Sequence, residues 1–183
     1  MKFSETALAG VYVVSPEHRR DERGSFARAF CIEEFTSHDI PMIIVQSNMS
    51  VSRWRGTVRG MHLQVHPAPE AKLVRCTRGA VLDVAADLRP GSATFGQWVG
   101  VNLTEDNGDA LYVPEGFAHG FQTLSDDAAI LYDTSAPYTP EAVRGARYDD
   151  PILDIRWPLP ISVISRQDRE WPLLDAQGAR RTG

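Results

Sequence analysis

The segment Gly108–His119 reads GDALYVPEGFAH and decides the fold. Apolar residues dominate both of its halves, and Pro114-Glu115-Gly116 separates them. Proline fixes one backbone dihedral of a tight turn, and glycine permits a positive one. The segment therefore predicts a strand, a tight turn and a second strand that points His119 into the interior of a barrel. The alternative is an ordinary hairpin with an incidental histidine.

Short strands are predicted on both sides of this segment, because residues alternate apolar with polar or are rich in Val, Ile, Leu and aromatic types. Helical patterns are confined to Cys31–His38 and to a turn or two within Glu141–Arg147. Closely spaced strands without intervening helices favour an all-β sandwich or barrel with a few short peripheral helices. The predicted strands are Val11–Ser15, Ser25–Phe30, Ile43–Ser50, Thr57–Gln64, Lys72–Cys76, Ala80–Asp87, Gln97–Leu103, Ala110–Val113, Phe117–Leu124 and Ala128–Thr134.

The length and charge of the chain limit its organisation and its partners. The chain has 183 residues without a linker or repeat, so residues 1–183 are expected to form a single domain with a loose polar tail from about residue 175. Acidic residues number 24 and basic residues 19, which gives a formal net charge of −5. That charge argues against a protein that coats nucleic acid or an anionic membrane, but it permits a local basic site for a phosphorylated small molecule.

Targeting signals and cysteine usage point to the cytoplasm. No apolar run approaches the roughly 18 residues of a membrane-spanning helix. The N-terminal residues MKFSETA lack the hydrophobic core of a signal peptide. Cys31 and Cys76 lie in unrelated contexts, so we expect no disulfide framework and a reducing, cytoplasmic location.

The segment Gly108–His119 fits the pattern G-x5-P-x-G-x2-H, which resembles the second conserved motif of cupins, the small jelly-roll barrels. In metal-binding cupins the first motif supplies His-x-His and a later glutamate. Here His62 begins that motif, but Gln64 replaces the second histidine and Lys72 replaces the glutamate. A protonated lysine repels a divalent cation, so the chain resembles a cupin barrel whose metal site is lost. A rebuilt metal site is the alternative, because two potential ligands lie nearby, His66 and Glu70.

From about Gly10 to Leu174 the chain resembles the dTDP-4-dehydrorhamnose 3,5-epimerase family. The motifs that carry this resemblance are Asp21–Gly24, Val45–Asn48, Val58–Gln64, Lys72–Arg75, Leu82–Ala85, Thr94–Trp98, Pro114–Phe121, Leu131-Tyr132 and Ile155–Pro158. The resemblance implies an enzyme that inverts carbons beside the ketone of a nucleotide-linked 4-keto-6-deoxyhexose. It also implies that no metal or organic cofactor is needed. Finally, it implies a homodimer in which N-terminal strands of one subunit help to complete the other's site.

The resemblance also assigns roles in catalysis. A proton next to a ketone leaves only if a base takes it and the enolate oxygen is stabilised. His62 matches the family's base, and Asp83 and Asp168 match the carboxylates near it. Lys72 matches the cation that meets the enolate. Tyr132 matches the acid that returns a proton from the opposite face, and a phenol of ordinary pKa, about 10, holds its proton at neutral pH.

Substrate-binding residues follow from the same resemblance. Arg23 and Arg59 match the diphosphate contacts, and the planar guanidinium suits bidentate recognition of phosphate. The remaining matches are polar contacts in the pocket, Gln46, Asn48 and His119, and an aromatic residue that stacks on the nucleobase, Tyr138.

Several positions depart from the family pattern, mostly on the nucleotide side. Arg19 stands where an aromatic residue is common, and Arg28 where a glutamate is usual. Gln167 and Asp133 each replace a lysine, and Val143 stands where another glutamate is expected. These arginines could strengthen diphosphate binding or fit a different base.

Other functions remain open from the sequence alone. No residue distinguishes epimerisation at C3, at C5 or at both carbons. A cupin 3,4-ketoisomerase on a similar substrate would also use enolisation, although Tyr132 favours the epimerase. A deoxysugar nucleotide of secondary metabolism is an alternative substrate. The alternatives of another class are a cupin that binds a sugar nucleotide without catalysis and a metal-dependent cupin oxygenase.

Overall fold

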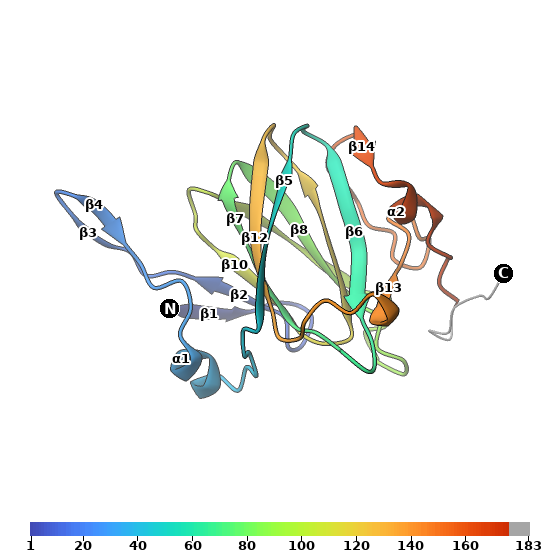
Figure 1. The fold of residues 1–183 in the computed structure, drawn as a ribbon, viewed down its shortest axis with the longest axis horizontal. Helices are drawn as coiled ribbons and strands as arrows, with labels where there is room; N and C mark the ends of the chain where they lie inside the picture. The colour runs from blue at the N-terminus through green and yellow to red at the C-terminus, as the bar shows by residue number, and fades with distance from the viewer. Residues whose placement is uncertain (176–183) are drawn as a thin grey trace.

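The computed structural model describes residues 1–175, so the predicted tail beyond residue 175 lies outside the described residues. Two six-stranded sheets form the body (Figure 1). The first sheet contains, in spatial order, β1 (Lys2–Glu5), β2 (Tyr12–Ser15), β10 (Ala110–Val113), β7 (Lys72–Arg78), β12 (Ala128–Thr134) and β5 (Gln46–Ser52). The second contains β13 (Val143–Gly145), β6 (Thr57–Gln64), β11 (Phe117–Thr123), β8 (Ala80–Asp87) and β9 (Trp98–Thr104), with β14 (Val163–Ile164) parallel to β6.

The main hydrophobic core fills the space between the two sheets. Val74 and Ile130 enter it from the first sheet, and Val81 and Phe121 enter it from the second. Because successive side chains of a strand point to opposite faces, the same strands also present a second set of residues away from this core. The prediction of an all-β jelly-roll barrel with short peripheral helices is confirmed.

Within residues 1–175, two short helices lie outside the barrel. Helix α1 (Ile32–Ser37) packs Phe35 against the outer face of the first sheet, where Leu73 and Tyr112 are buried with it. Helix α2 (Arg166–Glu170) begins after Ser165, whose hydroxyl accepts a hydrogen bond from the backbone of Asp168. This N-cap fixes the first turn of α2 beside β6.

A two-stranded arm projects from the body (Figure 1). It consists of β3 (Arg19–Asp21) and β4 (Gly24–Phe26), and all of its strand residues are exposed. Phe26 on this arm leaves 72% of its surface accessible.

Most predicted strands agree with the structure, and three segments differ. Strand β5 begins at Gln46, three residues after the predicted start at Ile43. Only the first part of the predicted strand Ser25–Phe30 is strand, because β4 pairs with β3 alone and ends at Phe26. The helical turn predicted within Glu141–Arg147 is present only at the start of that segment. A 3₁₀ turn at Pro140–Ala142 leads into β13, which pairs with β6.

No helix within residues 1–175 is long and apolar enough to span a membrane.

Candidate active site

A cavity of about 320 Å³ opens among strands β5, β6, β7 and β12. Even-numbered residues of these strands face it, because side chains alternate along each strand. Six residues predicted from the sequence line this cavity: Gln46, Asn48, His62, Lys72, Tyr132 and Tyr138. Three of the five predicted catalytic side chains and three of the six predicted binding side chains therefore line one cavity.

His62 is paired with Asp168, which α2 carries to the edge of the cavity. The His62 Nε2 atom lies 2.6 Å from Asp168 Oδ1. The backbone N–H of Gly60 donates to the other carboxylate oxygen at 3.3 Å. Burial by itself would raise the pKa of Asp168, but the hydrogen bonds from His62, Gly60 and Ser165 outweigh it and hold this pKa below its ordinary value. Asp168 is therefore a carboxylate that accepts a hydrogen bond from the Nε2–H group of His62 and leaves Nδ1 of His62 free to act as a base.

Lys72 is buried beside the same histidine. Its Nζ atom donates to the carbonyl oxygen of His62 at 3.2 Å and lies 3.1 Å from Oε1 of Glu70. The carboxylate that could have rebuilt a metal site thus pairs with a cation. Within residues 1–175, His, Cys, Asp and Glu side chains form no group of three or more that could hold a metal ion.

Tyr132 lies half-buried on β12 and faces the cavity. Burial raises the pKa of its phenol, and the negative charge of Glu70 raises it further, while Arg59 acts in the opposite direction. The net shift is upward. The phenol therefore keeps its proton at neutral pH and can serve as an acid.

The position of Asp83 differs from the prediction. The sequence predicts this carboxylate beside His62, but the structure pairs its Oδ1 atom with Nε2 of His119 at 2.8 Å. His119 stands opposite His62 in the pairing of β11 with β6, so the two histidines carry separate carboxylates. Asp83 is fully buried, and its Oδ2 atom accepts no hydrogen bond from the described residues. Neither Asp83 nor His119 is among the residues that line the cavity.

Comparison with known proteins identifies the family. The family model described as dTDP-4-dehydrorhamnose 3,5-epimerase matches residues 5–176. A protein of that name from Sinorhizobium fredii is 45% identical over 175 residues, which cover 95% of this chain and 90% of the relative.

The chain belongs to the dTDP-4-dehydrorhamnose 3,5-epimerase family.

Its members are isomerases, and this chain is an epimerase of that family. A solved dTDP-6-deoxy-D-glucose-3,5-epimerase from Legionella pneumophila, in complex with dTDP-4-keto-L-rhamnose, has a TM-score of 0.89 and 37% identity, covering 100% of this chain and 98% of that one. A dTDP-4-dehydrorhamnose 3-epimerase from Streptomyces niveus is 39% identical and covers 95% of this chain and 84% of the relative.

The two predicted diphosphate contacts lie in different surroundings. Arg59 is exposed on β6, where its Nε atom donates to the hydroxyl of Ser52 at 3.1 Å. Arg23 stands at the tip of the arm and pairs with Asp21, leaving 85% of its side chain exposed. The fold of one subunit therefore does not bring Arg23 to the cavity.

The departures from the epimerase pattern divide into two groups. Gln167 and Val143, at positions where the resemblance leads us to expect charged residues, line the cavity. The other three lie elsewhere in the structure. Arg19 is exposed on β3 of the arm, Arg28 pairs with Glu34, and Asp133 accepts a hydrogen bond from Ser47 on the opposite face of β12. Only the first group stands where it can contact a ligand in this cavity.

Sequence reasoning missed the contributions of Gln64 and Glu70. The amide of Gln64 is fully buried, donates to the carbonyl groups of Ala68 and Pro137, both at 3.1 Å, and accepts from the backbone of Thr139 at 2.6 Å. It thereby ties the loop after β12 to β6. The alternation that places His62 on the inner face places Gln64 there too, and this was the available signal.

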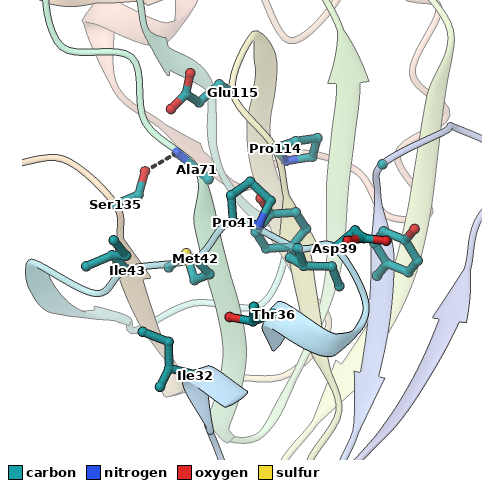
Figure 2. Close-up of a pocket in the computed structure, with 14 residues that line it drawn as sticks. Ile32, Thr36, Asp39, Pro41, Met42, Ile43, Ala71, Pro114, Glu115 and Ser135 are labelled. Carbon is teal, nitrogen blue, oxygen red and sulfur yellow. Dashed lines mark hydrogen bonds between the residues drawn. The ribbon is translucent and has the colours of Figure 1, made fainter. Parts of the chain in front are cut away.

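A larger cavity, of about 910 Å³, lies away from these residues (Figure 2). Figure 2 shows it between α1, the segment 39–43 and the first sheet, with Met42 and Ile43 among its walls. Ser135 on its border accepts a hydrogen bond from the backbone of Ala71 at 2.8 Å. Among the described residues its lining contains no histidine, lysine or arginine, so it offers neither an imidazole base nor a cation for the epimerase reaction.

Proposed function

We propose that the chain converts dTDP-4-dehydro-6-deoxy-D-glucose to dTDP-4-dehydro-L-rhamnose by inverting C3 and C5. One observation carries this proposal: a histidine base, a buried ammonium and a protonated phenol line a single cavity. Epimerisation next to a ketone needs these three functions together, because charge forms on oxygen while a proton leaves one face and another arrives at the opposite face. The names of the related proteins support the same substrate class.

The reaction begins at His62. Its Nδ1 atom removes the proton from the carbon beside the ketone, and the electrons of that C–H bond form the enolate. The imidazole becomes an imidazolium, which the Asp168 carboxylate at 2.6 Å stabilises. The N-cap of α2 and the backbone of β6 hold this carboxylate in place, so the ring keeps one orientation.

Lys72 and Tyr132 complete the reaction. The Lys72 ammonium donates to the enolate oxygen, where it balances the new negative charge. The Tyr132 phenol then delivers its proton to the carbon from the face opposite His62. Because C3 and C5 flank the same ketone, these groups can act on both carbons if the sugar ring adjusts.

We infer that a homodimer completes the nucleotide site. Arg23 lies on an exposed arm, and the exposed face of the edge strand β5 carries Met49 and Val51, which are 69% and 49% exposed. A second copy would cover this apolar face, and its arm would bring an arginine to the diphosphate. Arg59 at the rim would supply the second guanidinium, and Tyr138 would stack on the nucleobase.

Proton NMR in heavy water tests the proposed reaction. With dTDP-4-keto-6-deoxy-glucose as substrate, we expect enzyme-dependent loss of both the C3 and C5 proton signals together with formation of the inverted product. His62→Ala is the control, and in this variant both proton signals should persist and no inverted product should form. An absence of exchange with the wild-type protein would contradict the proposal and favour a different nucleotide or a binding protein.

Epimerisation at C3 alone is the second candidate, because the relative from Streptomyces niveus is a 3-epimerase. The same spectra distinguish the two. Loss of the C3 signal with an intact C5 signal would establish the single epimerase, whereas a new keto isomer would indicate the 3,4-ketoisomerase.

A further inference from the structure

Glu70 is a carboxylate in the cavity that the proposed reaction does not use. It lies in the loop between β6 and β7, and only 10% of its side chain is accessible to solvent. A buried charge is costly unless it is paired. The Lys72 ammonium at 3.1 Å supplies the pair, and both residues line the cavity that contains His62 and Tyr132.

The surroundings of Lys72 show what this pair accomplishes. A lysine side chain has a flexible stem and an ammonium with three N–H donors. One donor is used by the carbonyl oxygen of His62 at 3.2 Å, and the Glu70 carboxylate pairs with the ammonium from the connecting loop. Two anchors fix the position of the nitrogen, and the ammonium can still donate to a ligand.

We propose that Glu70 is a positioning residue, whose carboxylate holds the Lys72 ammonium where the enolate oxygen forms and also faces the Tyr132 phenol. This inference rests on the proposed function, in which Lys72 meets the enolate. A small displacement of a catalytic group can cost about 100-fold in rate, so such an anchor has a measurable effect.

The negative charge of Glu70 does not cancel this benefit. Proton transfer to His62 creates an enolate and an imidazolium together, so the net charge of the cavity stays the same. The Glu70 carboxylate repels the enolate and attracts the imidazolium. The position of the ammonium therefore decides the effect of Glu70 on the rate.

Tyr132 provides an independent reporter of the Glu70 charge. After burial, Glu70 makes the largest contribution to the raised pKa of this phenol, Arg59 opposes it and Tyr138 adds to it. His62 and Lys72 are the other titratable groups on the cavity wall. Removing the charge of Glu70 should therefore let Tyr132 titrate at a lower pH.

Steady-state kinetics test the role of Glu70. Glu70→Gln keeps the shape and removes the charge, and we expect kcat to fall between about 10-fold and 100-fold with KM changed less than about threefold. Glu70→Asp keeps the charge and should recover part of the loss. In a Lys72→Met background, Glu70→Gln should have little further effect, because its effect passes through the ammonium. An unchanged or higher kcat for Glu70→Gln would overturn the inference.

A titration without substrate completes the test. The ultraviolet absorbance of phenolate is followed against pH in wild type and Glu70→Gln. The absorbance curves of the matching Tyr132→Phe proteins are subtracted, which leaves the titration of Tyr132. We expect a lower midpoint in Glu70→Gln and wild-type midpoints in Glu70→Asp and in Glu105→Gln, an exposed control with the same charge change. Equal midpoints in Glu70→Gln and wild type would overturn the inference. A wild type that leaves the substrate unchanged would overturn the proposed function itself.

Discussion

At the scale of single residues, the partner of each histidine determines its chemistry. Asp168 accepts from Nε2 of His62 and is itself fixed by Ser165 and the backbone of Gly60. His119 pairs with the fully buried Asp83 instead. Two histidines that stand opposite each other on neighbouring strands thus differ in exposure, and only His62 opens to the cavity.

Tyr132→Phe should separate proton removal from inversion. His62 can still remove a proton and return deuterium from solvent to the same face, so exchange at the reacting carbon should persist. Inversion needs an acid on the opposite face, so product formation should fall by at least about 100-fold. NMR in heavy water records both quantities in one sample. Parallel loss of exchange and inversion would show that Tyr132 takes part in the first step.

The sequence predicts most of the cavity residues on strands and, through the family resemblance, the loop residue Tyr138, but it misses the loop residue Glu70. His62, Lys72 and Tyr132 share a face because strand alternation determines it. Glu70 lies in a loop, and its contact with Lys72 depends on how that loop folds back. Asp83 is the instructive error, because alternation gives its face but not which of two inward-facing histidines it contacts.

At the scale of elements, a close approach of two strands shapes the site. Gly60 of β6 has φ +123°, and a Cβ atom there would lie 2.5 Å from the Cα atom of Gly120 on β11. A side chain would therefore meet backbone, which cannot move aside as a flexible side chain can. The same segment of β6 donates to Asp168 and leads directly into His62, so the approach affects the geometry of the base.

Gly60→Ala should destabilise the fold far more than Gly24→Ala. Gly24 has φ +124°, almost the same backbone strain, but a Cβ atom there would meet nothing within 4 Å. Strain alone should cost about 1–3 kcal/mol, and Gly60→Ala adds the steric conflict. Urea unfolding of both variants measures the difference. Equal free energies of unfolding would mean that the two strands can separate without cost.

The boundaries of a strand can be predicted from the sequence where the strand's own residues show a clear hydrophobic pattern. Thr57–Gln64, Ala80–Asp87, Ala110–Val113 and Ala128–Thr134 agree with the predicted bounds. Short elements such as β13 and β14 do not show such a pattern, because each is defined by pairing with β6 rather than by its own residues. Their existence depends on contacts between segments far apart in the sequence, which local periodicity does not contain.

At the scale of the whole molecule, a buried carboxylate network should make stability depend on pH. Asp87 accepts hydrogen bonds from Arg89, Ser92 and Thr94, and although burial alone would raise its pKa, these bonds hold it well below the ordinary value. A depressed pKa in the folded state stabilises the protein above the unfolded pKa of about 3.9. That stabilisation is lost progressively as the pH falls below that value.

Asp87→Asn should therefore flatten the acid side of the stability profile. Wild type should lose thermal stability between about pH 5 and pH 2, and the variant, which starts lower at neutral pH, should lose less over that interval. Differential scanning calorimetry across the range measures both slopes. The same acid slope in both proteins would place the titrating group elsewhere.

The arm and the cavity together determine how the assembly can be tested. Arg23 lies outside the cavity of its own subunit, so in the proposed homodimer each active site combines His62 of one chain with Arg23 of the other. Arg23→Ala and His62→Ala homodimers then each contain two defective sites. A mixed dimer contains one site with both defects and one site with neither.

Mixing the two inactive variants should therefore restore activity. Random reassortment makes about half of the dimers mixed, and half of their sites intact, so about one quarter of the wild-type activity should return. The activity is measured after the variants are co-expressed or dissociated and recombined, with each variant alone as the control. If Arg23 served the site of its own chain, no combination of these subunits would contain an intact site, and the mixture would stay as inactive as its components.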